Sequence, residues 1–229
     1  TGISCRDIFD RGNVIRLNIF NSTASGIYLT STSPSPRGIT IENNTFNTVG
    51  TYGIRVFNCK SMGLVKTKVL NNTINYNAAV ANGKGVNVAN CDAITITGNT
   101  IASAALTSSG LRKFFRGVNI ENSPNAIVKT NTFNNFGTGI YAEGMIVGAQ
   151  FQCNTLYQNY YGFYMPNGLS VATVYSDQGT SAMPNDNQWT DHPSPTSGIP
   201  TYRITGDATP SIALKNWYYR AGSTSYFPN

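Results

Sequence analysis

The stretch Gly85-Val-Asn-Val-Ala-Asn-Cys-Asp-Ala-Ile-Thr-Ile-Thr-Gly-Asn99-Thr-Ile decides the fold. It opens with a glycine followed by alternating apolar and polar residues. Fourteen residues after that glycine, an Asn-Thr pair precedes a further apolar residue. Alternation with period two is typical of strands that direct one set of side chains inward and the other outward. The stretch therefore predicts a strand, a turn, a second strand and a further turn.

The glycine-led strand pattern occurs seven times along the chain. Successive glycines are 24, 27, 32, 32, 22 and 23 residues apart, which suits one turn of a β-solenoid with loops of variable length. The seven copies begin at Gly2, Gly26, Gly53, Gly85, Gly117, Gly139 and Gly162.

A second pattern keeps step with the first. An Asn, usually followed by Thr and an apolar residue, lies 14 to 19 residues after each of the first six glycines, at Asn18, Asn44, Asn72, Asn99, Asn131 and Asn154. Asp177 takes this place in the seventh repeat. An apolar residue precedes each of these positions by three residues, at Ile15, Ile41, Val69, Ile96, Val128, Phe151 and Val174.

Both patterns predict an all-β, right-handed parallel β-helix of about seven coils over residues 1–177. Equivalent strands would lie about 4.8 Å apart, in register. One inward column would hold Ile3, Ile27, Ile54, Val86, Val118, Ile140 and Phe163. A second would hold Cys5, Leu29, Val56, Val88, Ile120, Ala142 and Met165. Residues 178–229, which are rich in proline, would form an irregular β cap using Trp189, Tyr202, Ile204, Ile212, Leu214, Trp217 and Tyr218.

The repeated Asn residues have a mechanical explanation. Asn tolerates the left-handed backbone conformation, which suits the sharp bends between faces. Stacked Asn side chains can also hydrogen-bond along the axis, so we expect a structural ladder at the six Asn positions. N-glycosylation is the alternative at the sequons that begin at Asn21, Asn43 and Asn71.

Composition excludes several classes of protein. The net charge is +6, but the basic residues do not cluster along the sequence, so we expect no nucleic-acid partner. No apolar stretch is long enough for membrane insertion. The four cysteines form no CxxC motif and His192 is the single histidine, so we expect no metal and no other cofactor. Cys59 and Cys91 occupy the same place in consecutive repeats, where either a disulfide or two stacked thiols would fit.

An outward row of the first strand is a candidate glycan-binding face, made by Tyr28, Arg55, Asn87, Asn119, Tyr141 and Tyr164. Aromatic rings stack on sugar rings, and amides hydrogen-bond sugar hydroxyls. The structural alternative is that tyrosine simply favours exposed strand positions.

We assign no catalytic residue. Glycoside hydrolysis generally needs two converging carboxylates, and the best pair is Glu121 and Glu143 on adjacent coils, with Arg55 a few coils away on the same face. Two stacked glutamates on a solvated face are the ordinary interpretation. His192 lies in the expected cap without a recognisable nucleophile.

Through the repeats from Gly2 to about Gly168, the chain resembles the parallel β-helix repeat proteins. It most resembles the Asn-rich β-helix proteins that some Gram-negative bacteria export by type IX secretion. Asp177-Gln-Gly-Thr-Ser and Trp217-Tyr-Tyr resemble the tails of such proteins. The resemblance implies a secreted or cell-surface bacterial location.

We therefore expect a non-enzymatic structural or adhesive module that is part of a longer polypeptide. Its partners would be polysaccharide or other surface or secretion components. The alternatives are a polysaccharide lyase or glycoside hydrolase of the β-helix type and a module like a phage tailspike.

Overall fold

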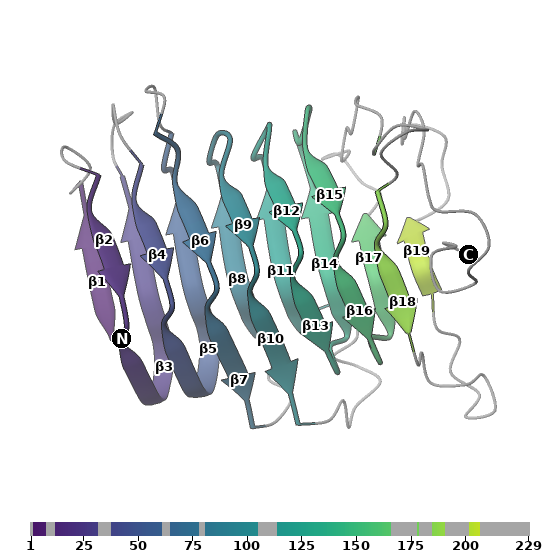
Figure 1. Ribbon diagram of the computed structural model, residues 1–229, viewed down its shortest axis with the longest axis horizontal. Coiled ribbons are helices and arrows are strands. Elements are labelled where there is room, and N and C mark those ends of the chain that lie inside the picture. Colours follow the sequence, from purple (N-terminus) through teal and green to yellow (C-terminus); the bar gives the residue numbers. More distant parts are fainter. Residues whose placement is uncertain are drawn as a thin grey trace.

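The computed structural model describes residues 2–7, 12–31, 38–60, 65–77, 81–104, 114–165, 178, 185–190 and 202–206. All regular structure in these residues is β-strand, and all strand pairing is parallel. Figure 1 shows the strands side by side as successive rungs of one rod, from the N-terminal purple end to the green end.

The rod has three faces. Two of them belong to one sheet, in which β3 (Ile19–Thr30) and β5 (Thr45–Phe57) each run across both faces. The C-terminal parts of β3 and β5 contribute to the first face. Its other strands are β1 (Ile3–Arg6), β8 (Lys84–Ala89), β11 (Arg116–Glu121), β14 (Thr138–Glu143), β17 (Tyr161–Met165) and β19 (Tyr202–Gly206).

The second face begins with the N-terminal parts of β3 and β5. It continues with β7 (Thr73–Tyr76), β10 (Thr100–Ser103), β13 (Thr132–Asn134), β16 (Thr155–Tyr157) and β18 (Gln188–Thr190). The third face is a separate sheet of six strands: β2 (Val14–Arg16), β4 (Thr40–Glu42), β6 (Lys68–Leu70), β9 (Thr95–Thr97), β12 (Ile127–Lys129) and β15 (Gln150–Gln152).

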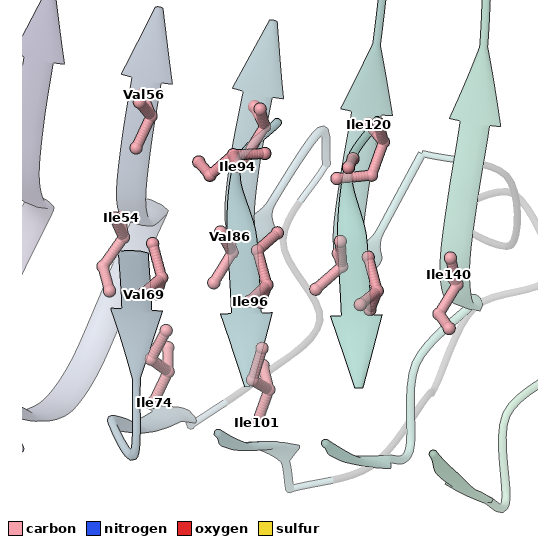
Figure 2. Packing of buried hydrophobic residues seen from close by; sticks show 14 of the residues in the cluster. Ile54, Val56, Val69, Ile74, Val86, Ile94, Ile96, Ile101, Ile120 and Ile140 are labelled. Atoms are coloured by element: carbon pink, nitrogen blue, oxygen red, sulfur yellow. The ribbon is translucent and has the colours of Figure 1, made fainter. Parts of the chain in front are cut away.

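The expected inward columns are confirmed. On the first face Ile54 pairs with Val86, Val86 with Val118, and Val118 with Ile140. These four side chains are at most 1% exposed. In Figure 2 the apolar side chains of the three faces meet inside the coils. The chain is thus a parallel β-helix whose core is a set of apolar columns, each built from residues one coil apart.

The predicted Asn positions form one continuous column. The backbone N–H and the side-chain amide of each Asn donate to the Oδ1 of the Asn one coil further along, at 2.9–3.0 Å. Each Nδ2 from Asn44 to Asn154 also donates to a backbone carbonyl of the preceding coil at 2.9–3.0 Å. These five amides are at most 1% exposed.

The prediction for the last member of this column is wrong. Asn154 donates to the Oδ1 of Asn187, at 2.9 Å, so Asn187 and not Asp177 continues the ladder. Asp177 and Val174 lie outside the described residues. Asn187 precedes β18, which pairs with β16, and β19 pairs with β17. The parallel stacking therefore continues beyond residue 177, where the sequence suggested that the coils end.

The cap predicted for residues 178–229 is described only in part. Trp189 lies on β18, and Tyr202 and Ile204 lie on β19. The remaining apolar residues proposed for the cap, and His192, lie outside the described residues. Gln178 is fully buried, and its side chain bonds the backbone of Phe151 and Ala149 at 2.9 and 2.8 Å.

The left-handed corners do not fall on the ladder residues themselves. The residue immediately before each ladder Asn has a positive φ, between 44° and 69°: Leu17, Asn43, Asn71, Gly98, Thr130, Cys153 and Asp186. The ladder Asn side chains are engaged by the next coil, while the preceding residue makes the bend. The expectation that the ladder Asn residues adopt this conformation is therefore wrong.

Thr130 is poorly suited to this corner, because a β-branched residue is disfavoured at a φ of 53°. Thr130→Asn is expected to raise the free energy of unfolding by about 1 kcal/mol, since Asn tolerates the left-handed region better. The reciprocal change Asn71→Thr, at the equivalent exposed corner, should lower it by a similar amount. Urea unfolding of both variants measures the effect, and equal stabilities would contradict it.

Candidate functional site

The structure brings the six residues of the candidate glycan-binding row into one line across the first face. Consecutive members pair in register from β3 to β17: Tyr28, Arg55, Asn87, Asn119, Tyr141 and Tyr164. Because neighbouring strands lie about 4.8 Å apart, the row follows the long axis of the rod.

The row is not an exposed strip along its whole length, which corrects the expectation of a continuous outward face. Tyr28 and Arg55 are partly exposed. The other four members, Asn87, Asn119, Tyr141 and Tyr164, are at most 6% exposed. Only the N-terminal end of the row is therefore open to a ligand.

The buried part of the row is a packed network centred on Arg116. This side chain is 9% exposed, and its guanidinium lies over the ring of Tyr141, 3.3 Å from the ring centroid. It donates a hydrogen bond to Asn119, whose amide donates to Asn87 at 2.8 Å. Arg116 thus packs against Tyr141 and links it to the amides of Asn119 and Asn87 within the row.

Charges accompany this network. The Tyr141 hydroxyl donates to Glu143 at 2.7 Å, and Glu143 pairs in register with Glu121. Burial lowers the pKa of Arg116, although Tyr141 and Glu143 oppose the shift. Burial, together with the charge of Arg116, also lowers the pKa of Lys84. Burial thus disfavours the charged forms of both cations, whereas Glu121 and Glu143 favour them.

The candidate catalytic residues lie as expected relative to one another. Glu121 and Glu143 are neighbours on adjacent coils, and Arg55 lies on the same face, on β5, two strands away from Glu121 on β11. The cations that act electrostatically on the glutamates are Lys84 and Arg116. One of the two carboxylates, Glu143, is already engaged by a tyrosine hydroxyl.

The open end of the row is an aromatic patch around one arginine. The Arg55 guanidinium lies 5.1 Å from the ring centroids of Tyr28 and Tyr52 and 5.5 Å from that of Phe57. The ammonium of Lys84 lies 5.8 Å from the Tyr52 ring. We call these five residues the Arg55 patch.

Arg55 keeps unused hydrogen-bonding capacity. Its Nε is buried and has no hydrogen-bond partner in the described part of the chain. A guanidinium has five N–H donors in a fixed plane, and aromatic contacts leave the donors at its edge unused. The patch therefore offers rings for stacking together with donors for an oxygen-rich ligand.

Sequence reasoning missed three members of this patch. Phe57 is the next outward residue after Arg55, so alternation alone could have placed it. Tyr52 could not be placed in this way. Alternation back from Arg55 would turn position 53 outward and position 52 inward. Gly53 instead faces the core, where an added Cβ would lie 2.8 Å from Ile74. Lys84 occupies the position in register with Tyr52 one coil later.

Cys59 and Cys91 lie in a buried column next to the first face. Both are free thiols, 3% and 1% exposed. Each sulfur is 3.3–3.4 Å from the carbonyl oxygen two residues earlier, Phe57 or Ala89. Ser123 takes the next place in the column and bonds the carbonyl of Glu121 in the same way, at 2.7 Å.

The described residues contain no group of three His, Cys, Asp or Glu side chains placed to hold a metal ion. Within that same part of the chain, no helix is long and apolar enough to cross a bilayer.

Comparison with known proteins agrees with the architecture. A family model described as a right-handed β-helix region matches residues 1–180, more than three quarters of the chain. Searches of curated proteins and of solved structures found no match.

Proposed function

We propose a function for this chain that starts from its membership of the right-handed β-helix family. It is a rigid, non-enzymatic adhesive module that binds glycans. The Asn ladder and the apolar columns support the structural part of this proposal. They join every coil to its neighbour along the rod, so a load on one coil is shared through backbone and side-chain hydrogen bonds.

The Arg55 patch is the observation that carries the binding part. Sugars present apolar ring faces and a rim of hydroxyl oxygens. The rings of Tyr28, Tyr52 and Phe57 would stack on the faces, while Arg55 and Lys84 would donate to the oxygens. Since the patch spans three adjacent coils, from β3 to β8, it is wide enough to contact more than one sugar residue.

The proposal places the protein outside the cell or on the surface of a bacterium, with polysaccharide or other surface components as partners. Its support is the Asn-rich repeat, which resembles that of β-helix proteins exported by type IX secretion. Fractionation of the native host tests this location, and recovery of the protein in the cytoplasm alone would contradict it.

Glycan binding is tested with a panel of soluble bacterial and plant polysaccharides in affinity gel electrophoresis. For a retained polysaccharide, Arg55→Ala should weaken binding at least tenfold, because central aromatic and arginine side chains dominate such interfaces. Arg16→Ala is the matched control, since Arg16 is an exposed arginine on the third face. Equal binding by both variants would contradict the patch, and retention of no polysaccharide would contradict the glycan-binding proposal.

An enzymatic alternative rests on the adjacent Glu121 and Glu143 beside Lys84 and Arg116. A hydrolase would release new reducing ends from the same panel, and a lyase would produce unsaturated sugars. Loss of such products in Glu143→Gln, with binding retained, would favour an enzyme over an adhesive module. A threefold assembly in light scattering would instead favour a module of the phage tailspike type.

A further inference from the structure

Cys59 and Cys91 lie opposite each other on adjacent coils. Paired residues flank them on both sides: Phe57 pairs with Ala89 before them, and Lys60 bridges to Asp92 after them. Adjacent parallel strands are about 4.8 Å apart, and disulfides join residues whose Cα atoms are about 4.4–6.8 Å apart. The backbone therefore already holds the two cysteines at a separation that a disulfide can span.

The Cys91 thiol points toward the coil of Cys59. The sulfur of Cys91 lies 3.6 Å from the carbonyl oxygen of Val56, which belongs to the coil of Cys59. The pKa of the Cys59 thiol is raised, chiefly by a hydrogen bond with the Cys91 side chain and secondly by burial. The Cys91 side chain thus reaches the coil of Cys59, and its thiol acts on the Cys59 thiol.

No other cysteine among the described residues competes for this pairing. Cys5 pairs in register with Leu29 on the first face, and Cys153 is exposed at a corner of the third face. On the far side of Cys91 the column continues with Ser123, whose hydroxyl accepts a hydrogen bond from the backbone N–H of Cys91 at 3.1 Å.

An approach for an oxidant exists at Cys91. A pocket of about 440 Å³ is lined by Lys60, Asn90, Cys91, Asp92, Asn122, Pro124 and Met145. Exchange with a small disulfide molecule would therefore begin at Cys91.

From this geometry we infer that Cys59 and Cys91 form a reversible disulfide that joins two consecutive coils. The Cys91 thiol loses its proton and attacks a small-molecule disulfide, which gives a mixed disulfide and releases one small thiol. The Cys59 thiol then loses its proton and attacks the Cys91 sulfur, which releases the second small thiol. The two protein thiols are oxidised, and one small-molecule disulfide is reduced to two thiols.

The experiment uses the full chain with Cys5→Ser and Cys153→Ser, so that only the pair remains. The folded protein is incubated with excess oxidised glutathione, then denatured and treated with a maleimide. The expected product carries no maleimide and no glutathione, and its mass is lower by two hydrogens. Proteolysis without reductant should yield one cross-linked peptide pair containing Cys59 and Cys91.

Adding Cys59→Ser or Cys91→Ser to this background provides the control. Ser123 already occupies the column as a serine, so the substitution suits the site. Each control should end with one maleimide or one glutathione. Two maleimides or two glutathiones on the parent protein, after prolonged exposure, would overturn the inference.

Thermal unfolding supplies a second, independent measurement. The disulfide would close a loop of about 32 residues in the unfolded chain. Oxidation of the parent should therefore raise the unfolding temperature by on the order of 10 °C, and dithiothreitol should reverse the rise. A cross-linked product with an unchanged or lower unfolding temperature would show a strained bond and would contradict the preformed geometry.

Discussion

Asn99→Ala is expected to lower the free energy of unfolding by about 4 kcal/mol, because it leaves several buried groups without partners at once. The Oδ1 of Asn99 accepts the backbone N–H and the side-chain amide of Asn72, at 2.9 and 3.0 Å. Its Nδ2 donates to the carbonyl of Val69 and to Asn131, both at 2.9 Å. Urea unfolding followed by circular dichroism measures the loss.

The position of the residue within the ladder provides the matched control. Asn18 is partly exposed, and its Oδ1 accepts no hydrogen bond from the described residues. Its side chain donates to Asn44 and to Arg16. Asn18→Ala should therefore cost only about 1 kcal/mol, because water can satisfy the groups that it leaves.

Asn99→Leu separates hydrogen bonding from packing. Leucine fills nearly the same volume, so the variant removes the amide without leaving a large cavity. If the hydrogen bonds of the ladder stabilise the coil, Asn99→Leu should be about as unstable as Asn99→Ala. Recovery of most of the stability in Asn99→Leu would mean that the column matters mainly as packed volume.

The apolar columns and the Asn column could be predicted from sequence because both depend on short-range spacing. Period-two alternation fixes which side chains face inward, and a repeated Asn-Thr pair fixes the register from coil to coil. These patterns placed Ile54, Val86 and Val118 in one column, and the structure confirms it.

Features that depend on loop length could not be predicted from the sequence. The ladder continues at Asn187, 33 residues after Asn154, whereas the sequence pattern selected Asp177 after 23 residues. Earlier spacings in the ladder range from 23 to 32 residues, so spacing alone could not exclude either position. The left-handed corners could not be predicted from residue type either, because residues as different as Leu17, Gly98 and Thr130 occupy them.

The exposure of the candidate binding row depends on contacts between coils. Alternation correctly placed Asn119 and Tyr141 in the outward row, but it could not show that the Arg116 guanidinium lies over Tyr141 and bonds Asn119. An outward strand position is open only if its long neighbours leave it uncovered. Arg55 meets this condition in part, which is why the candidate site is confined to the N-terminal end of the row.

Gly117→Ala is expected to lower the free energy of unfolding by about 3 kcal/mol or more, because its Cβ would have no space. An added Cβ would lie 2.6 Å from the carbonyl oxygen of Gly139 on the next coil and 2.6 Å from the ring of Phe133. Phe133 is fully buried, so the ring cannot swing away into solvent. Thermal and urea unfolding measure the loss.

The same obstruction explains why a glycine opens every repeat. A Cβ on each column glycine from Gly2 to Gly139 would lie 2.5–2.8 Å from the carbonyl oxygen of the next glycine in the column. Gly12→Ala is the control: a Cβ there would meet no atom within 4 Å, so its expected cost of about 1 kcal/mol comes from the backbone alone, at a φ of 66°.

A double variant identifies which contact dominates at this column. Gly117→Ala combined with Phe133→Leu removes the ring contact but leaves the oxygen of Gly139 in place. Because that oxygen belongs to the backbone of the adjacent coil, the added leucine should restore only part of the lost stability. Full restoration would mean that ring packing, and not the close approach of consecutive coils, requires glycine at this position.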